Sequence, residues 1–358
     1  MENVTLQVVQ HLNPGGIEHL VLNLLRFSSP GYKQYVVALE GNKADAIQAW
    51  PELLPFKDQL FFLNKPIGKS LSTVIKLRNL IQKLNVSVVH SHHIGPLLYS
   101  RLATVTTKIR HIQTEHDSWH LQNEKQRRLT KWLLSSNKVQ LVADAPRVAL
   151  QLEKILGRPA DHIILNGIDT DYFSPGHQLF SRQHLCIPHN KIVIGCAGRL
   201  VKEKGLDIAI IALTQLPDDH HLVIAGQGPE EQALKQLASQ HQVSHRIHWL
   251  GYCSKMRNFY RAIDLFCMPS RQEGLPLALL EAQACGKSVV ATKVGGIPDL
   301  LCPLSGILVE PNIPQLLANA LMKGLKHNKE VSIHNARFVR DCADIRTMAT
   351  RYESVAFS

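Results

Sequence analysis

Short apolar runs rich in β-branched residues alternate with longer segments of helical periodicity along the whole chain. This alternation is typical of parallel α/β sheets, in which a helix follows each strand and covers the sheet. Between two series of such runs lies a segment rich in Gly, Pro and Asp, residues 166–176. The expected strands are 6–9, 35–39, 59–62, 86–90, 111–113 and 140–143, then 192–197, 221–225, 247–250, 265–268, 288–291 and 306–309. The sequence therefore predicts two doubly wound sheets of five or six strands each.

The length of 358 residues agrees with two domains of ordinary size. We expect one domain over residues 1–170 and a second over 171–340. The remaining residues, 341–358, form the end of a helical tail that could pack on its own domain or cross back to the first. Because ligands bind outside the carboxyl ends of the strands in such sheets, two facing sheets would share one cleft.

The composition excludes several classes of protein. A content of 45% hydrophobic and 19% charged residues is that of a globular protein. No apolar run approaches the roughly 18–20 residues of a membrane-spanning helix, and the chain opens directly on an expected strand rather than on a signal peptide. Seven single cysteines without a Cys-x-x-Cys pair fit a reducing compartment. We therefore expect a cytoplasmic protein.

The net charge of +11 is concentrated in the first half of the chain. Residues 1–143 carry 17 Lys and Arg against 9 Asp and Glu, and the remainder carries 23 against 20. The segment 69–84 is basic, free of acidic residues and amphipathic, so it could lie on an anionic membrane at the inner face of the cytoplasmic membrane. An ordinary surface helix is the alternative. We expect no nucleic-acid partner, because the basic residues are not interleaved with aromatic ones.

One segment places two carboxylates around the start of an expected helix. It reads Ser270-Arg-Gln-Glu-Gly-Leu-Pro-Leu-Ala-Leu-Leu-Glu281, with a Gly and a Pro marking a turn before the apolar run 277–284. The N-terminus of a helix offers free N–H groups and a partial positive charge, which suit a diphosphate. Glu273 would lie at the mouth of the helix and Glu281 about two turns along, each able to bind hydroxyl groups. This arrangement predicts a site for a sugar nucleotide.

Other loops that follow expected strands also carry residues suited to phosphate. In Gly198-Arg-Leu-Val-Lys-Glu-Lys-Gly205, the cations Arg199 and Lys204 would neutralise a departing diphosphate. The loop Gly226-Gln-Gly-Pro229 follows a further strand on the same presumed edge. Near the start, Asn13-Pro-Gly-Gly16 precedes a helical segment, and its glycines would allow a phosphate or sugar to come close to the backbone. Solvated surface charge and an ordinary Pro-Gly turn are the alternative interpretations.

Histidines gather at the ends of two expected strands. One strand ends in Val88-Val-His-Ser-His-His93 and the next in Gln113-Thr-Glu-His-Asp117. Adjacent histidines can bind a metal ion, so a metal site among these residues is an alternative hypothesis. The four candidate ligands are His92, His93, His116 and Asp117. No pair of histidines at helical spacing supports such a site, and we expect none.

Taken in order, these motifs closely resemble those of retaining glycosyltransferases of family 4, which have the two-domain GT-B fold. The resemblance extends from residue 1 to about residue 350. Its motifs are Pro-Gly-Gly-Ile-Glu, Val-Val-His-Ser-His-His, Thr-Glu-His-Asp, Asn-Gly-Ile-Asp, Gly-Arg-Leu-Val-x-x-Lys-Gly, Gly-x-Gly-Pro and Glu-Gly-Leu-Pro-Leu-x-Leu-Leu-Glu. The last of these, two glutamates separated by seven residues with Gly-Arg-Leu ahead of them, is the specific one.

The resemblance implies that the second domain binds a nucleotide sugar. Arg199 and Lys204 would hold its diphosphate and Glu281 its ribose hydroxyls. Glu273 would face the transferred sugar near the reacting carbon. Three further positions would line the nucleotide site: Gly228, Gly274 and Leu275.

From the first domain, the resemblance implies that Gly16 abuts the phosphates and that His116 contacts the donor sugar. The same domain would receive the acceptor. Family members retain the anomeric configuration and need no divalent metal, since the two cations assist the leaving group. The chain departs from the family after the strand 140–143, where Asp144 stands in place of a common Ser, which puts the contact made there in doubt.

The predicted function is therefore the transfer of a hexose from a nucleotide donor, UDP-linked in our interpretation, to a glycan or lipid-linked acceptor. The setting would be the synthesis of bacterial surface polysaccharide or lipopolysaccharide. A nucleotide-sugar epimerase of similar fold is the alternative among enzymes. A non-catalytic protein that binds nucleotide sugars is the alternative from another class, against which the intact set of site residues argues. The sequence argues against a NAD-dependent dehydrogenase, because no strand is followed by Gly-x-Gly-x-x-Gly with a downstream acidic residue.

Overall fold

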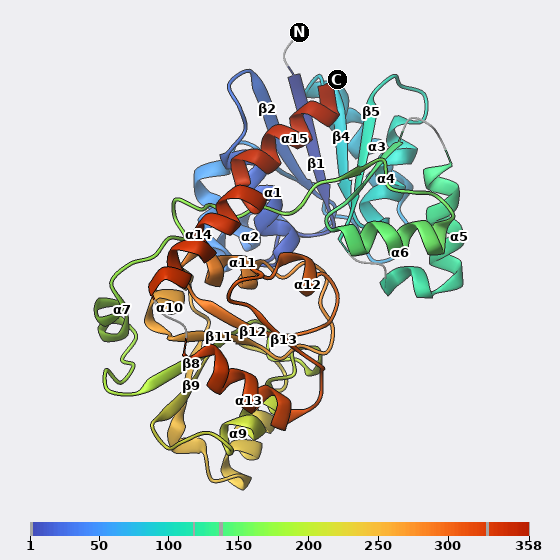
Figure 1. Ribbon diagram of the computed structural model, residues 1–358. Helices are drawn as coiled ribbons and strands as arrows, with labels where there is room; N and C mark the ends of the chain where they lie inside the picture. Colours follow the sequence, from blue (N-terminus) through green and yellow to red (C-terminus); the bar gives the residue numbers. More distant parts are fainter. Residues whose placement is uncertain (1–2, 117–118, 136–138, 327–328, 358) are drawn as a thin grey trace. The chain divides into compact units, whose positions relative to one another are not determined.

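The computed structural model describes residues 3–116, 119–135, 139–326 and 329–357. The chain forms two compact units. The first comprises Met1–Gly167 together with Ile345–Ser358, and the second comprises Ile168–Asp344 (Figure 1). No helix among the described residues is long and apolar enough to cross a membrane.

The first unit is built on a parallel sheet of seven strands in the order β3-β2-β1-β4-β5-β6-β7. The strands are β1 (Asn3–Val9), β2 (Tyr32–Ala38), β3 (Leu60–Phe62), β4 (Val88–His92), β5 (Arg110–Glu115), β6 (Val139–Ala143) and β7 (His162–Ile163). The prediction of five or six strands was wrong by one. The missed strand β7 has only two residues, both exposed, so no apolar run marks it in the sequence.

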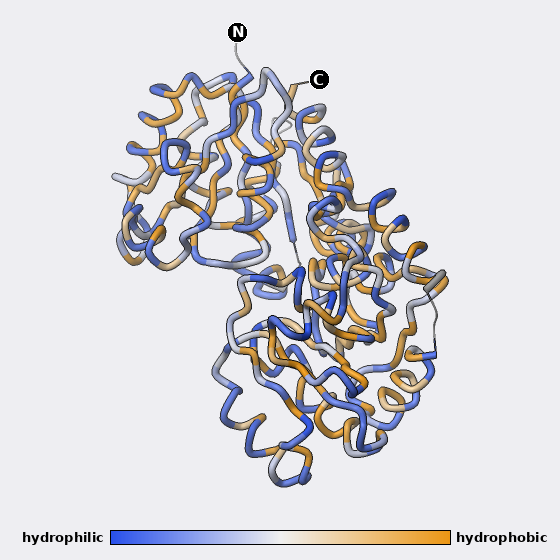
Figure 2. Tube along the Cα trace, turned by 90° about the vertical axis from the view of Figure 1, so that its left-hand side faces the viewer, coloured by the Kyte–Doolittle hydropathy of each residue, from blue (hydrophilic) through white to orange (hydrophobic). Residues whose placement is uncertain are grey.

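Amphipathic helices cover this sheet, and Figure 2 shows hydrophobic and hydrophilic residues alternating along them. They are α1 (Gly16–Arg26), α2 (Lys43–Ala49), α3 (Leu71–Lys83), α4 (Ile94–Thr104), α5 (Glu124–Leu134), α6 (Pro146–Leu156) and α15 (Ile345–Phe357), with short 3-10 helices η1 (Pro51–Phe56) and η2 (Trp119–Gln122). The apolar faces of these helices pack against the sheet and bury its apolar side chains in a hydrophobic core.

The tail of the chain forms two helices rather than the single one that its composition suggested. The helix α14 (Lys329–Ala343) is followed by Asp344, which forms a parallel bridge with Ile168 in the second unit. The helix α15 then packs on the first unit through a core shared with α1. Its Glu353 carboxylate accepts a hydrogen bond of 2.8 Å from the backbone N–H of Ser29.

The second unit contains a parallel sheet of six strands in the order β10-β9-β8-β11-β12-β13. The strands are β8 (Ile192–Ala197), β9 (His220–Ala225), β10 (Ile247–Gly251), β11 (Leu265–Met268), β12 (Ser288–Thr292) and β13 (Ile307–Val309). The helices are α7 (Gln178–His184), α8 (Leu206–Leu213), α9 (Glu231–Gln240), α10 (Met256–Ala262), α11 (Leu277–Ala284), α12 (Ile297–Leu300), α13 (Pro314–Gly324) and α14, with 3-10 helices η3 (Lys202–Lys204) and η4 (Ser244–Arg246). Six strands agree with the prediction.

Both sheets reverse their strand order at one point, between β1 and β4 in the first unit and between β8 and β11 in the second. The loops that leave two such neighbouring strands run in opposite directions and open a crevice at the carboxyl edge of the sheet. Ligand-binding residues are therefore expected in the loops that follow β1, β4, β8 and β11.

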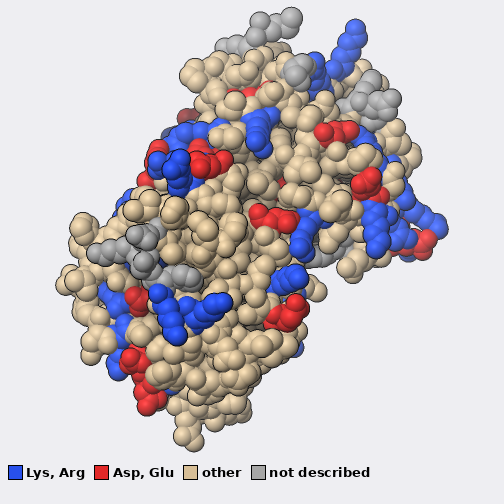
Figure 3. Space-filling model, viewed as in Figure 1, with Lys and Arg blue, Asp and Glu red and all other residues tan. Residues whose placement is uncertain are grey.

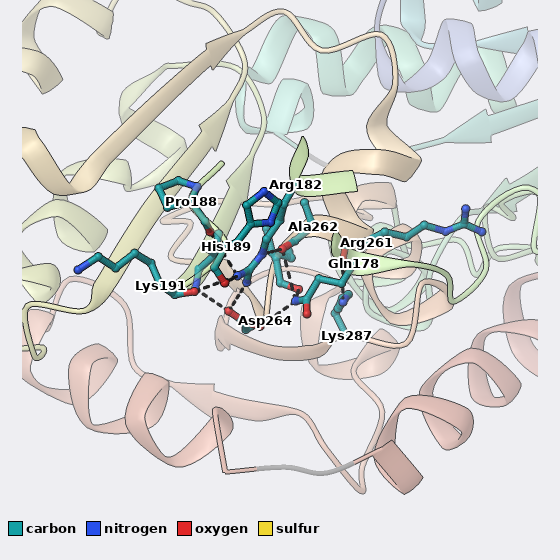
Figure 4. A network of polar contacts seen from close by, with 11 residues as sticks. Gln178, Arg182, Pro188, His189, Lys191, Arg261, Ala262, Asp264 and Lys287 are labelled. Atoms are coloured by element: carbon teal, nitrogen blue, oxygen red, sulfur yellow. Dashed lines mark hydrogen bonds and ion pairs between the residues drawn. The ribbon is translucent and has the colours of Figure 1, made fainter. Parts of the chain in front are cut away.

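At the opposite edge of the second sheet, an ion pair between a buried arginine and a partly exposed aspartate attaches α7 to the strands (Figure 4). The Arg182 guanidinium lies 2.7 Å from the Asp264 carboxylate and donates to the Ala262 carbonyl at 2.8 Å. Asp264 also accepts hydrogen bonds from the Val193 N–H and the Gln178 amide. Arg182 is almost fully buried, so these partners, rather than water, stabilise its positive charge.

Replacing Arg182 by Met is expected to lower the free energy of unfolding by about 3 kcal/mol, because the Asp264 carboxylate loses its buried partner. Chemical denaturation followed by circular dichroism measures this change. The matched control is Arg337→Met on α14, which removes an exposed pair with Asp341 and should change stability by less than about 0.5 kcal/mol. Equal effects of the two variants would show that the Arg182 network contributes no more than a surface ion pair.

Candidate nucleotide-sugar site

The switch point of the second sheet brings together Lys204 and Glu273, which are far apart in sequence. Lys204 ends the 3-10 helix η3 in the loop after β8, and Glu273 lies in the loop after β11. The Lys204 amine is 2.7 Å from the Glu273 Oε1, which also accepts a hydrogen bond of 2.7 Å from the Ser270 hydroxyl. Glu273 is buried, whereas Lys204 is partly exposed. An ammonium group has three donors, so Lys204 can pair with Glu273 and still offer N–H groups to an anion.

Close backbone packing holds these loops together and explains several glycines. Gly205 has a φ of +62°, and a Cβ there would lie 2.1 Å from the Pro269 carbonyl oxygen. Gly295, with a φ of +53°, packs in the same way on the carbonyl of Glu273. Side chains larger than hydrogen are excluded at both positions, because the neighbouring atoms are backbone. The Lys204 and Glu273 loops are therefore fixed by contacts that require glycine.

Gly228 also serves this packing. A Cβ at Gly228 would lie 2.4 Å from the Leu200 carbonyl oxygen, and the Leu200 N–H donates to the Gln227 carbonyl at 2.9 Å. The loop after β9 is thus paired with the loop that carries Arg199, whose own side chain is exposed. The structure gives Gly228 a role in loop packing, and a contact between Gly228 and a nucleotide stays a prediction.

The helix α11 begins at Leu277, directly after Pro276, and its first turn carries no side-chain cap. The uncapped N–H groups of a first turn can bind an anion. Gly274 and Leu275 are half-buried in the loop that leads into this turn, as the sequence predicted. Glu281 lies only about one turn into the helix rather than two, because it is the fifth residue of a helix that begins at Leu277.

Glu281 receives a hydrogen bond of 2.7 Å from the Tyr260 hydroxyl on α10. Burial raises the pKa of Glu281 from 4.5 to about 7, and the hydrogen bond from Tyr260 opposes this shift. Burial, followed by the nearby Glu281 charge, raises the pKa of Tyr260 well above 10, so the phenol stays protonated and acts as the donor. The hydrogen bond from Tyr260 therefore holds the Glu281 carboxylate in one orientation, while burial disfavours its charged form.

In the first unit, a chain of hydrogen bonds connects side chains of β1 and β4 with side chains of the loops after β5, β6 and β7. The His92 Nε2 is 2.9 Å from the Gln7 Oε1, and its Nδ1 is 3.1 Å from the His116 Nε2. The His116 Nδ1 is in turn 3.1 Å from the Asp144 carboxylate, which also accepts from the Asn166 amide at 3.2 Å. Both ring nitrogens of His116 are thus engaged within the first unit. A donor sugar bound by the His116 side chain would have to replace one of these contacts.

The two histidines that these hydrogen bonds connect, His92 and His116, are buried. Burial, reinforced by the neighbouring His90, lowers the pKa of His92 well below its ordinary value, so His92 is neutral at pH 7. Among the described residues, no group of three or more His, Cys, Asp or Glu side chains is arranged to hold a metal ion. Asp117, one of the four ligands of the alternative metal hypothesis, lies outside the described residues.

Gly16 opens α1 in the loop after β1, at the switch point of the first sheet. Among the described residues, no atom outside the neighbouring backbone lies within 4 Å of a Cβ added at Gly16. Glu18, two residues further, is buried, and burial raises its pKa, against the favourable interaction with His11. The position of Gly16 is compatible with a ligand close to the backbone.

The sequence alone does not identify several residues that support these sites. Tyr260 and Ser270 orient the two glutamates of the second unit, but nothing in the sequence marks them as partners of those carboxylates. Asp144 was noted only as a departure from the family pattern, and it forms the hydrogen bond that holds His116. Asn166 was visible in its Asn-Gly-Ile-Asp motif, where its contact with Asp144 could have been suspected.

Two doubly wound parallel sheets in a single chain, each with a loop site at its switch point, define the GT-B class of architecture. A family model described as Glycosyltransferase Family 4 matches residues 14–172, and one described as Glycosyl transferases group 1 matches residues 178–338. The chain belongs to the GT-B glycosyltransferases of the family 4 type.

Named relatives agree with this assignment. The chain is 29% identical over 297 residues to the lipopolysaccharide core biosynthesis mannosyltransferase LpsB of Rhizobium meliloti, which covers 76% of this chain and 78% of that protein. It is 36% identical over 180 residues to a D-inositol 3-phosphate glycosyltransferase of Corynebacterium jeikeium, which covers 46% of this chain and only 43% of that protein. The crystal structure of Anabaena HepE in complex with UDP and glucose has the same fold, with a TM-score of 0.84, 22% identity and coverage of 99% of both chains.

Proposed function

We propose that this glycosyltransferase moves a hexose from a UDP-linked donor to a glycan or lipid-linked acceptor, with retention of the anomeric configuration. The acceptor would belong to bacterial surface polysaccharide or lipopolysaccharide synthesis. The observation that carries the donor part of the proposal is the Lys204–Glu273 pair at the switch point, beside the uncapped start of α11. The names of LpsB and of the O-antigen biosynthesis glycosyltransferase WclY of Escherichia coli support the acceptor class.

The chemistry of the proposed reaction requires cations near the leaving group. The bond between sugar and diphosphate breaks through an oxocarbenium-like state while negative charge builds on the departing phosphate. Arg199 and Lys204 would stabilise that charge without a divalent metal, together with the N–H groups at the start of α11. Glu281 would hold the ribose hydroxyls, and Glu273 would orient Lys204 and face the sugar.

The proposal is tested first by thermal shift with UDP-, GDP- and ADP-linked hexoses, since a ligand that binds only the folded protein raises its apparent stability. The bound donor is then incubated with the protein, and proton NMR identifies the anomer of the sugar released by slow hydrolysis. Retention predicts that an α-linked donor first yields the α anomer. Release of the β anomer would refute retention, and conversion of the donor into its epimer without release of nucleotide would identify the alternative epimerase.

We also propose that α3 touches an anionic membrane during transfer to a lipid-linked acceptor. Leu77 and Ile81 pack into the core, but Leu71 and Ile75 are exposed one turn apart on the helix, and Ile67 just before it is fully exposed. The exposed Lys69, Lys76 and Lys83 accompany these apolar side chains. Elsewhere the charges are mixed: on the face drawn in Figure 3, basic and acidic side chains are interspersed over both units. Exposed apolar residues flanked by lysines are typical of helices that lie at a membrane surface.

Reversing the charge of Lys69, Lys76 and Lys83 to Glu is expected to weaken binding to phosphatidylglycerol-containing vesicles at least tenfold, since each lysine near such a surface contributes about 1 kcal/mol. Vesicle sedimentation measures the bound fraction. The control carries Glu at Lys235, Arg337 and Arg340 in the second unit and should bind as the unaltered protein does. Unchanged binding of the α3 variant would refute the membrane contact.

A further inference from the structure

We infer that Arg271 is a positioning residue that locks the Lys204 turn against the Glu273 loop, and so sets the affinity of the site for the diphosphate of the donor. The expected effect on donor affinity rests on the proposed function, whereas the lock itself is seen in the contacts of the Arg271 side chain. Arg271 lies in the loop after β11, two residues before Glu273.

The Arg271 guanidinium is shared among three segments. Its Nη1 and Nη2 bind the Asp207 carboxylate in a two-pronged contact of 2.8 and 2.6 Å, at the first turn of α8. The same Nη1 donates to the Lys202 carbonyl at 2.7 Å, and the Nε donates to the Asn312 side chain at 2.6 Å in the loop after β13. A planar fork with fixed donors suits this arrangement, which a point charge such as Lys does not reproduce.

The backbone strengthens the same connection. The N–H groups of Arg271 and Gln272 both donate to the Glu203 carbonyl, at 2.7 and 3.3 Å. On the other side of Lys204, Gly205 packs on the Pro269 carbonyl with no room for a Cβ. Lys204 is therefore held through both of its chain neighbours by the segment that also carries Glu273.

The side-chain hydrogen bonds of Arg271 go to Asp207, Asn312 and the Lys202 carbonyl, and not to the Lys204 amine or to Glu273. Arg271 thus acts on a ligand through Lys204. Loss of the Arg271 guanidinium would leave the charge of Lys204 intact, but Lys204 would no longer be held in one position. This matters because a cation stabilises a phosphate best when it is already in place.

A double-mutant cycle tests this inference with UDP as the probe, measured by calorimetric titration. Arg271→Ala and Arg271→Lys should each weaken UDP binding about tenfold, equivalent to about 1.4 kcal/mol. If Arg271 acts through Lys204, adding Arg271→Ala to Lys204→Ala should weaken binding no further. Multiplying effects, or unchanged affinity in both single variants, would overturn the inference. The exposed Gln272→Ala serves as the matched control and should bind UDP normally.

A readout without ligand separates this inference from the proposed function. Reductive ¹³C-methylation gives each lysine an NMR signal, and the Lys204 signal is assigned by its absence in Lys204→Arg. In the unaltered protein this signal should differ from that of exposed lysines because of the Glu273 pair, and Arg271→Ala should move it toward the exposed value. A Lys204 signal that does not move would overturn the lock even if UDP bound tightly. A moved signal in a protein that binds no UDP would sustain the lock and refute the proposed donor.

Discussion

Replacing Lys204 by Ala is expected to reduce the release of UDP from the sugar donor by roughly 100-fold or more, the typical effect of removing one group that stabilises developing charge. Lys204 lies 2.7 Å from the buried Glu273 and keeps two further N–H donors, which we propose bind the leaving diphosphate. Without it, negative charge on the departing phosphate would be met by Arg199 and the start of α11 alone. A coupled assay for UDP measures the rate.

The control for this prediction lies in the same turn. Lys202 is exposed, and its Ala variant removes an equal charge two residues away while keeping the backbone carbonyl that Arg271 binds. Lys202→Ala should therefore retain most of the activity. Equal losses in both variants would indicate that only the net charge of the turn matters, and unchanged turnover in Lys204→Ala would refute its assigned role.

Replacing Glu281 by Gln is expected to have two opposite effects. At pH 8, where Glu281 is charged, UDP binding should weaken about 10- to 100-fold, since the charged acceptor that we propose for the ribose hydroxyls is lost. The free protein should become more stable at pH 8. In the folded protein the pKa of Glu281 is raised to about 7 from 4.5, so folding favours its protonated form. The stability that this preference contributes is present below pH 4.5 and is lost as the pH rises through 7.

The expected gain from Glu281→Gln at pH 8 is about 2 kcal/mol once partial exposure is taken into account, and it should vanish near pH 4.5. Denaturant unfolding at the two pH values measures it. The matched variant is Tyr260→Phe, which removes the hydrogen bond to Glu281 and should lower stability at pH 8. If Glu281→Gln changes the free energy of unfolding by the same amount at both pH values, this carboxylate carries no desolvation cost.

The fold was predictable because its determinants are local. Each strand of both sheets except β7 is an apolar run that a helix follows, and the order of such runs fixes a doubly wound sheet. The break in the C-terminal tail was not predictable, since Asp344, directly after α14, pairs with Ile168, a residue far away in the sequence. Such pairing leaves no local pattern.

The site was predictable to the extent that single residue types reveal a chemistry. Lys204 and Glu273 were both predicted, and the structure brings them into contact. The support around them was not, because Tyr260 is 21 residues from Glu281 and on another helix, and Arg271 reaches Asp207 across 64 residues. These partners depend on which loops meet at the switch point, which follows from the strand order rather than from any motif.

The most direct test of the central claim, that the switch point of the second sheet binds the nucleotide diphosphate, is amide hydrogen exchange with and without saturating UDP. We expect slower exchange in the segments 198–206 and 270–284, where the cations, the loop and the start of α11 lie. We expect no change in 178–192, around the Arg182 ion pair at the opposite edge. Protection absent from 198–206 and 270–284 while UDP is bound would contradict the account.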